Sequence, residues 1–453
     1  MSTPPAPTRP LWQSFLIFLA PMLLSNVLQA MSGTINNIYV GQMLGVGAMA
    51  AVASFFPILF FFIAFAIGLG SGASVLIGQA WGAREPAKVK AIAGTTLCAG
   101  MIFGLGVAVL GGLFAPALLA GLGTPADILQ DATDYARIMF IGMPALFLFL
   151  MSTAMMRGVG DTLTPLITLI ISTLIGLVVT PALIQGWGGL PRQGAASGGW
   201  AMLISMACAS VWMVWYLRHG HHALAPDAQM LRNFRITPAL LKQVLRVGLP
   251  TSLFMVTSSL ADLALLSVVH GYGSGATAAW GAVNQVMAYV QFPAISISIT
   301  ASIFAAQAIG ARRTERLWPI TRTGLQMNLL LTGGLALLAL TFARPLTGLF
   351  ITDTKVVDLT VTLLRITVFS GILFGMSSVF SGVMRASGTV LVPTAMSLAC
   401  VALLQAPVGW ALSRQFGVQG VWMAYPITFF CSMSLQALYY GLVWRRKPHR
   451  RLV

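Results

Sequence analysis

Apolar residues form long runs along this chain, and short polar stretches separate them. Runs such as 48–77, 92–118 and 323–343 exceed the roughly 20 apolar residues that cross a bilayer as a helix. The alternation of polar and apolar residues that is typical of a membrane barrel is absent. The pattern predicts twelve membrane-spanning helices, near 14–38, 48–77, 92–119, 135–156, 163–185, 199–217, 249–270, 278–306, 323–343, 362–384, 391–411 and 420–444.

The composition agrees with a chain that folds in lipid. Hydrophobic residues make up 57% of it and charged residues 8%, and the mean hydropathy is +0.86. The net charge of +16 comes from Lys and Arg in the loops on one side and in both tails, which indicates membrane topology rather than nucleic-acid binding. We therefore expect a multi-pass protein of the inner or plasma membrane with both termini in the cytoplasm.

The sequence repeats itself at a fixed step. Gln79, Gly82, Ala83 and Arg84 recur 228 residues later, since Gln79 corresponds to Gln307 (307 − 79 = 228). The repeat predicts an all-α integral membrane fold with two six-helix lobes, and transporters place their substrate between such halves. The same step relates Arg137 to Arg365, Met156 to Met384, Arg157 to Arg385, Gly160 to Gly388 and Pro165 to Pro393.

These patterns predict three parts along the chain. The N-lobe, residues 1–217, holds helices 1 to 6, and the C-lobe, residues 249–453, holds helices 7 to 12 and a basic cytoplasmic tail. Between them, the linker 218–248 is basic and has an amphipathic stretch from Thr237 to Val247. Such a segment is expected to lie along the cytoplasmic interface, and a passive tether is the alternative.

Nothing in the sequence indicates an enzyme, a bound metal or a cofactor. The chain has no nucleophile with a base and an orienting acid, and no phosphate-binding glycine loop that follows a strand. His219, His221 and His222 cluster in the linker without acidic or Cys partners nearby in sequence, which favours a solvated basic loop over a metal site. Cys98, Cys208, Cys400 and Cys431 lie at unrelated depths in apolar spans and are interpreted as small buried hydrophobes.

Several segments resemble the multidrug and toxic compound extrusion (MATE) transporters. They are Asn36-Asn37-Ile38-Tyr39-Val40-Gly41, Gln79-Ala80-Trp81-Gly82-Ala83, Met156-Arg157-Gly158-Val159-Gly160-Asp161-Thr162 and Gln307-Ala308-Ile309-Gly310-Ala311. The resemblance covers nearly the whole chain. It implies two six-helix lobes around a V-shaped cleft and antiport of organic solutes against H⁺ or Na⁺. A monomer would suffice, with a small organic solute, the ion and membrane lipids as its partners.

The sequence departs from the family at the residues that usually couple transport to an ion. Asn36 stands where the family's first helix typically has Asp, and an amide does not exchange a proton in the working pH range. In the fifth helix Gly176 and Thr180 stand at the positions of the family's Asn and Asp. In the seventh, Ser258 stands where one branch carries Glu. The resemblance therefore predicts an N-lobe cavity without an acid.

One acidic residue lies inside a predicted span. Of the ten Asp and Glu residues, nine fall in loops or at span ends, which leaves Asp262 in helix 7. It shares a helix face with Ser258 and Ser259. A carboxylate at mid-membrane costs about 2.5 to 3.5 kcal/mol and normally faces a cavity or a partner. We expect Asp262, with Ser258 and Ser259, to bind the coupling ion, H⁺ or Na⁺, and permanent pairing between helices is the alternative.

Other polar residues in the spans are candidates for the substrate cavity, although each could instead hold helices together. Met255, Phe254, Met287 and Phe292 are candidates for an adaptable apolar wall, and packing is the alternative for each. Pro57 and Pro293 interrupt helices 2 and 8 at corresponding places and are candidate hinges. The cavity candidates are Gln29, Asn36, Asn37, Met255, Asn284, Gln285, Tyr289, Gln291 and Gln405.

The sequence thus predicts a secondary active efflux antiporter that works by alternating access. Its solute is expected to be cationic or amphipathic, because an ionised Asp262 would attract it. A flippase for a lipid-linked precursor is the alternative, although such a protein would be expected to carry basic residues in the cavity for phosphate groups. No Lys or Arg lies mid-span in the predicted helices.

Overall fold

The protein is described by a computed structural model that covers residues 9–189, 194–220, 222–348, 353–449 and 451–452. Within these ranges the ordered elements are helices, and no strand occurs. Helices satisfy their backbone N–H and C=O groups internally, which lipid requires of a spanning segment. Eleven helices are long and apolar enough to cross a membrane, and a bent pair makes twelve. The all-α, twelve-helix prediction is confirmed.

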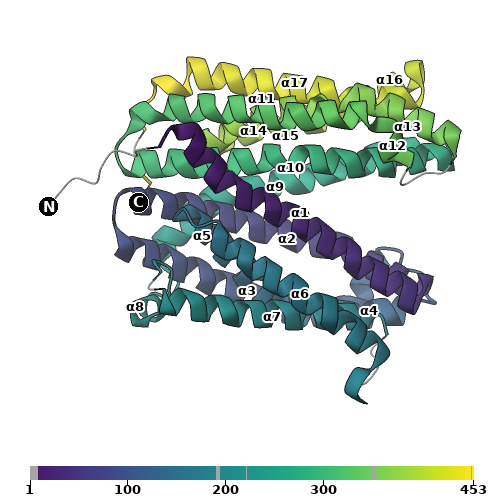
Figure 1. Ribbon diagram of the computed structural model, residues 1–453, viewed down its shortest axis with the longest axis horizontal. Helices are drawn as coiled ribbons and strands as arrows, with labels where there is room; N and C mark the ends of the chain where they lie inside the picture. The colour runs from purple at the N-terminus through teal and green to yellow at the C-terminus, as the bar shows by residue number, and fades with distance from the viewer. Residues whose placement is uncertain (1–8, 190–193, 221, 349–352, 450, 453) are drawn as a thin grey trace. The chain divides into compact units, whose positions relative to one another are not determined.

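The described residues form two compact units (Figure 1). The N-terminal unit is Leu24–Leu249, and the C-terminal unit combines Met1–Leu23 with Pro250–Val453. The chain passes from one unit to the other inside two long helices, α1 (Leu11–Leu44) and α9 (Pro238–His270). The first part of α1 therefore packs in the C-terminal unit, where the Phe15 and Phe304 ring centroids lie 4.9 Å apart.

In the N-terminal unit, the fourth predicted span is two helices rather than one. The helices α4 and α5 meet at Gly142 with a bend of 52°, which corrects the expected single helix 135–156. Pro144 has no N–H to donate, and a side chain at Gly142 would collide with Leu203. The elements are α2 (Val46–Gly82), α3 (Pro86–Gly121), α4 (Leu129–Ile141), α5 (Met143–Gly158), α6 (Leu163–Gln185), η1 (Trp187–Gly189), α7 (Ala196–His219) and α8 (Ala228–Arg232).

In the C-terminal unit, the tenth span is likewise interrupted, between α13 and α14, and the eleventh contains a π-helical turn, η3. The elements after α9 are α10 (Ser274–Gly310), η2 (Thr314–Arg316), α11 (Leu317–Thr341), α12 (Ala343–Gly348), α13 (Thr354–Thr367), α14 (Ser370–Ala386), α15 (Leu391–Cys400), η3 (Val401–Gln405), α16 (Ala406–Phe416), α17 (Val418–Leu442) and η4 (Trp444–Arg446).

The seventh span starts earlier than the sequence predicts. The amphipathic stretch that we expected in the linker is the first part of α9, which begins at Pro238. It packs on α2 without room for larger residues, because a side chain at Gly72 would collide with the Val244 carbonyl. One turn further, a side chain at Gly248 would come 2.5 Å from the Gly68 carbonyl oxygen. The described linker is thus confined to the residues between α7 and Pro238.

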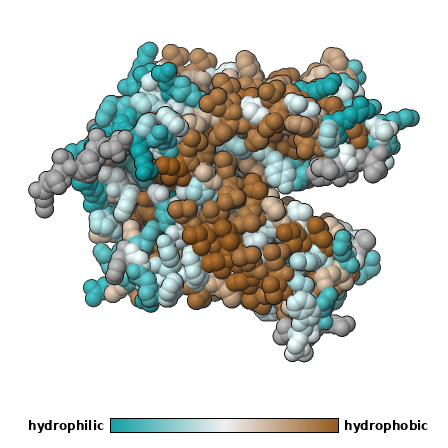
Figure 2. Space-filling view, viewed as in Figure 1, coloured by the Kyte–Doolittle hydropathy of each residue, from teal (hydrophilic) through white to brown (hydrophobic). Residues whose placement is uncertain are grey.

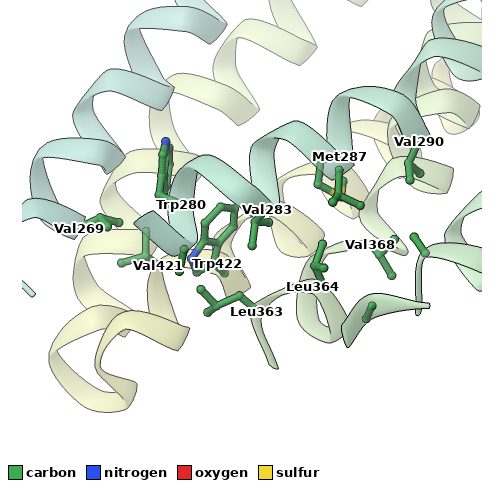
Figure 3. Packing of buried hydrophobic residues seen from close by; sticks show 14 of the residues in the cluster. Val269, Trp280, Val283, Met287, Val290, Leu363, Leu364, Val368, Val421 and Trp422 are labelled. Carbon is green, nitrogen blue, oxygen red and sulfur yellow. The ribbon is translucent and has the colours of Figure 1, made fainter. Parts of the chain in front are cut away.

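Packing in the C-terminal unit centres on apolar residues of α10, α13 and α17 (Figure 3). Val283, Leu363, Leu364 and Val421 are completely buried there. On the visible face, hydrophobic residues cover the flanks of each bundle, whereas hydrophilic residues gather toward the bundle ends (Figure 2). This distribution is expected for helices whose sides face lipid and whose ends face water.

Candidate coupling-ion and substrate site

Asp262 lies on α9 and accepts two hydrogen bonds from other helices. Its Oδ1 atom accepts from Gln405 Nε2 at 2.8 Å and from Tyr425 OH at 2.9 Å. Gln405 is the last residue of the π-helical turn η3, and such turns are frequent at functional sites. Tyr425 belongs to α17. Two donors on one oxygen suit an ionised carboxylate, which only accepts hydrogen bonds.

The second carboxylate oxygen of Asp262 has no hydrogen-bond partner among the described residues. The Gln405 side chain is 1% exposed, and its Oε1 atom also lacks a partner in the described part of the chain. In Asp262, Oδ1 is therefore held by two hydrogen-bond donors, whereas Oδ2 is available to bind a proton or a cation.

An aromatic cluster continues from Tyr425. The Tyr425 ring stacks on the Trp422 ring with centroids 5.6 Å apart. The ring centroids of Trp422 and of Trp280 in α10 lie 4.7 Å apart. Trp280 and Trp422 belong to the buried apolar cluster shown in Figure 3. Asp262 is thus bonded at the edge of an apolar, aromatic region, where an uncompensated charge is costly.

Ser258 and Ser259 lie on the same helix as Asp262 and are partly buried, but they are not among its hydrogen-bond partners. Gln405 was predicted from the sequence as a cavity residue, whereas the structure joins it to Asp262. Tyr425 was not predicted, because a lone Tyr in an apolar span gives no periodic signal. Its spacing from Trp422 was the one available clue, since the pair shares a face of α17.

In the N-terminal unit, Asn36 faces the interior of the bundle. A side chain at Gly198 of α7 would lie 3.7 Å from Asn36 Nδ2. One turn along α1, Tyr39 OH donates to the Leu177 carbonyl of α6 at 3.5 Å. Gln29 and Asn37 lie on the exposed side of α1. Of the three amide residues expected to border the N-lobe cavity, Asn36 therefore faces the bundle interior, whereas Gln29 and Asn37 face outward.

The remaining candidates lie on α9 and α10. Asn284, Gln285 and Tyr289 are exposed, and Gln291 is partly buried. Met287 lies in the buried apolar cluster, so packing explains it better than a cavity wall. The hydrogen-bond partners of Asp262 are Gln405 and Tyr425, and none of these four polar residues of α10 is among them. Met255, like Phe254 and Phe292, is partly buried.

Comparison with known proteins decides the family. The sequence model described as MatE matches the chain twice, over residues 21–182 and 250–411, once in each half. The chain belongs to the MATE family. It is similar to a probable multidrug resistance protein, YoeA, of Bacillus subtilis, with 42% identity over 98% of this chain and 96% of the relative.

Two further similarities extend over most of the chain. An FAD transporter of Shewanella oneidensis is 26% identical over 85% of this chain and 84% of its own length. Among solved structures, a MATE crystal structure in complex with MaL6 matches with a TM-score of 0.87 and 21% identity, over 96% of this chain and 95% of the other. MATE proteins are transporters rather than enzymes, so the chain is a multi-pass membrane transporter.

The MATE chain contains both candidate hinge prolines inside continuous helices. Pro57 lies in α2 and Pro293 in α10, and their role as hinges remains a prediction. Among the described residues, no group of three or more His, Cys, Asp or Glu side chains could hold a metal ion. The four Cys residues are free thiols. Cys98 and Cys400 are buried as expected, whereas Cys208 is exposed and Cys431 partly buried, which corrects the interpretation of these two as buried hydrophobes.

One expectation for the linker is corrected. His222 is not simply solvated, because its Nε2 atom lies 3.4 Å from Asp161 Oδ2 in the turn before α6. Burial raises the pKa of Asp161, but hydrogen bonds from His222 and Thr164 outweigh this effect and hold the pKa below its ordinary value. His221 lies outside the described residues.

Further contacts attach the linker of this MATE chain to α3. Lys90 forms an ion pair with Asp227, which also caps α8 by accepting from the Met230 N–H at 2.9 Å. Thr95 Oγ1 donates to the Arg235 carbonyl at 3.1 Å. A side chain at Gly94 would collide with the backbone of Asn233. The linker is therefore docked on the N-terminal unit, and a passive tether does not describe it.

Proposed function

We propose that this transporter exports organic cations or amphipathic solutes in exchange for H⁺ or Na⁺, and that Asp262 binds the coupling ion. The observation that carries the proposal is the pair of hydrogen bonds on Oδ1 of this carboxylate, which leaves Oδ2 without a partner among the described residues. The multidrug resistance described for the Bacillus subtilis relative supports an organic solute. The excess of Lys and Arg in the loops on one side supports a cytoplasmic location for both termini.

Competition for one charge explains antiport. An ionised Asp262 at the edge of an apolar region favours either a small coupling cation or a cationic solute. If both compete for this carboxylate, each promotes release of the other through the equilibrium between inward-open and outward-open states. The ion gradient then drives the solute outward. The chain supplies the ion site from its own side chains, and no cofactor enters the cycle.

The experiment measures uptake of tetraphenylphosphonium by proteoliposomes under separately imposed H⁺ and Na⁺ gradients. We expect one of the two gradients to drive transport, and Asp262→Asn to abolish this response while the protein remains folded. The matched control is Asp127→Asn, which changes an exposed acid in a loop and should transport normally. Full gradient-driven transport by Asp262→Asn would overturn the proposal.

The FAD transporter among the relatives calls for a second substrate in the same assay. FAD is a large anion, so an ionised Asp262 would repel it. Transport of FAD together with failure to transport tetraphenylphosphonium would contradict the cationic substrate class. A flippase for a lipid-linked precursor is not favoured by the described functions of these relatives.

A further inference from the structure

A polar face runs along α17 inside the C-terminal unit, starting one turn beyond Tyr425. Thr428, Ser432, Gln436 and Tyr440 follow one another at spacings of three to four residues, so they share one side of the helix. Their exposed fractions are 0%, 5%, 1% and 2%. Four hydrogen-bonding side chains are thus buried in a row that leads from the Asp262 site toward the basic tail.

Hydrogen bonds connect this row to α14 and α15. Ser432 Oγ lies 3.0 Å from Ser377 Oγ and 3.3 Å from Ser397 Oγ. Gln436 Nε2 donates to Ser397 Oγ at 2.6 Å. At the end of the row, Tyr440 OH lies 2.8 Å from Thr321 Oγ1 of α11. We name the set of Ser377, Ser397, Thr428, Ser432, Gln436 and Tyr440 the α17 polar seam.

Three buried oxygens along this path have no hydrogen-bond partner among the described residues. They are Gln405 Oε1, Thr428 Oγ1 and Gln436 Oε1. An unsatisfied polar group is destabilising where lipid excludes bulk water. Buried water normally bonds to such groups. Water bound to Gln405 Oε1, Thr428 Oγ1 and Gln436 Oε1 would complete their hydrogen bonding and continue the row between Asp262 and Tyr440.

The N-terminal unit provides an internal comparison. In α7, which ends the first half, residues 197, 201, 205, 209, 213 and 217 are buried, and in α17 residues 420, 424, 428, 432, 436 and 440 are buried. The buried positions of both faces repeat every four residues. The last three positions hold Ala209, Met213 and Leu217 in α7, against Ser432, Gln436 and Tyr440 in α17. Helix packing in this fold therefore does not require the polar side chains.

We propose that the α17 polar seam conducts the coupling proton between Asp262 and the end of the C-terminal unit that carries the basic tail. The inference rests on the proposed function and makes H⁺ the coupling ion. A proton leaves the Asp262 carboxyl group, which becomes the carboxylate that Gln405 and Tyr425 hold. Each hydroxyl or water then accepts one proton on a lone pair and releases its own, so the seam itself is unchanged after one passage.

The geometry of the seam suits H⁺ rather than Na⁺. A helix rises about 5.4 Å per turn, so side chains spaced by one turn cannot surround one metal ion along the row. Hard cations need several oxygen ligands at once. Protons need only a succession of donors and acceptors.

The test uses Thr428→Val, which removes an unpaired hydroxyl at nearly constant volume. A merely structural hydroxyl without a partner can be replaced in this way without loss of stability. The matched control is Thr173→Val in α6, whose buried hydroxyl likewise has no partner among the described residues. Ser432→Ala is the second seam variant, and it removes the hydroxyl contacts with both Ser377 and Ser397.

The readout is proton release from proteoliposomes that contain a pH-sensitive dye, after addition of tetraphenylphosphonium, in H₂O and in D₂O. We expect both seam variants to slow release by about tenfold or more, with an increased solvent isotope effect. Tetraphenylphosphonium affinity and melting temperature should stay unchanged, and Thr173→Val should behave as wild type. Proton release at the wild-type rate by Thr428→Val would overturn the proposal that the α17 polar seam conducts protons. An equal slowing of proton release in Thr173→Val would overturn it as well.

The experiments distinguish failure of proton conduction through the α17 polar seam from failure of the proposed function. Transport driven by Na⁺ alone would refute the proton seam but leave Asp262 as the ion-binding residue. Normal H⁺-driven transport by Asp262→Asn would refute the proposed function. Loss in Asp262→Asn with wild-type rates in both seam variants would refute only the path.

Discussion

Arg84 and Arg312 hold the same left-handed backbone conformation, with φ of 60° and 58°. They stand at the end of α2 and of α10, 228 residues apart. The turns around them are closed by matching hydrogen bonds, from Glu85 N to the Ala80 carbonyl at 3.0 Å and from Arg313 N to the Ala308 carbonyl at 2.8 Å. The repeat that the sequence indicates is therefore present in the local backbone as well as in the residue types.

These two arginines predict a stability effect. A non-glycine residue in the left-handed region costs roughly 1–2 kcal/mol, so Arg84→Gly should raise the stability of the purified protein by up to about 1 kcal/mol. Arg84→Val should lower it, because a branched side chain fits this region less well. Thermal unfolding in detergent measures both. The control is Arg313→Gly, where φ is −104° and glycine should bring no gain.

Docking of the linker predicts opposite effects for two glycines of α3. Gly94→Ala should destabilise the protein by about 1–3 kcal/mol, because the added methyl group collides with the backbone of Asn233. Gly106→Ala has open space around its Cβ and should be neutral or stabilising by up to about 1 kcal/mol. Melting temperatures compare the two variants. Equal melting temperatures would show that the linker does not rest on α3.

The contact between His222 Nε2 and Asp161 Oδ2 predicts an acid limit for linker docking. The pKa of Asp161 lies below its ordinary value of 3.8, so its contribution is present above that pH and is lost as the pH falls through the lower value of the folded state. Amide exchange at Ala225, whose N–H donates to the His222 carbonyl, should rise after correction for intrinsic rates as the pH falls below about 4.

Asp161→Asn should remove this contribution at all pH values, so exchange should be faster already at neutral pH. Asp227, whose pKa is also lowered by Lys90 and by the Met230 N–H, titrates in the same acidic range, and it is the linker residue that pairs with Lys90 of α3. The comparison variant is Asp127→Asn, which should show the exchange of the wild type.

The inward position of Asn36 predicts that a carboxylate can be restored there. Asn36→Asp should leave the protein folded, because the side chain keeps its size beside Gly198. It should also make tetraphenylphosphonium affinity depend on pH or Na⁺ in a way that survives Asp262→Asn. Binding titrations at several pH values measure this, with Gln229→Glu in α8 as an exposed control. An affinity that stays independent of both ions would contradict a cavity at Asn36.

Most of the fold could be predicted from the sequence because lipid permits few solutions. An apolar run of sufficient length becomes a helix, and the offset between Gln79 and Gln307 relates the two halves. The bend at Gly142 was not predictable in this way, since residues 135–156 remain largely apolar on both sides of it. It depends on the approach of Leu203 from another helix, and the run itself contains no such information.

The candidate site could be predicted only as single residues. Asp262 stands out because a charge in an apolar run is costly, and Gln405 stands out as an amide in a span. Their pairing depends on how α9 and η3 pack, and a one-dimensional pattern does not encode this. Tyr425 was missed because its ring looks like ordinary packing until its hydroxyl group is seen on Asp262.

The crossing of the chain inside α1 and α9 has a consequence for biosynthesis. The N-terminal unit cannot be completed when the ribosome has made the first half, because Val244 and Gly248 must still reach α2. Conversely, Phe15 is among the first residues made, yet its ring contact with Phe304 can form only after the ribosome has made α10. A gene divided in the linker between 219 and 237 would therefore yield two products that each lack a part of their own bundle, and only co-expression could restore both.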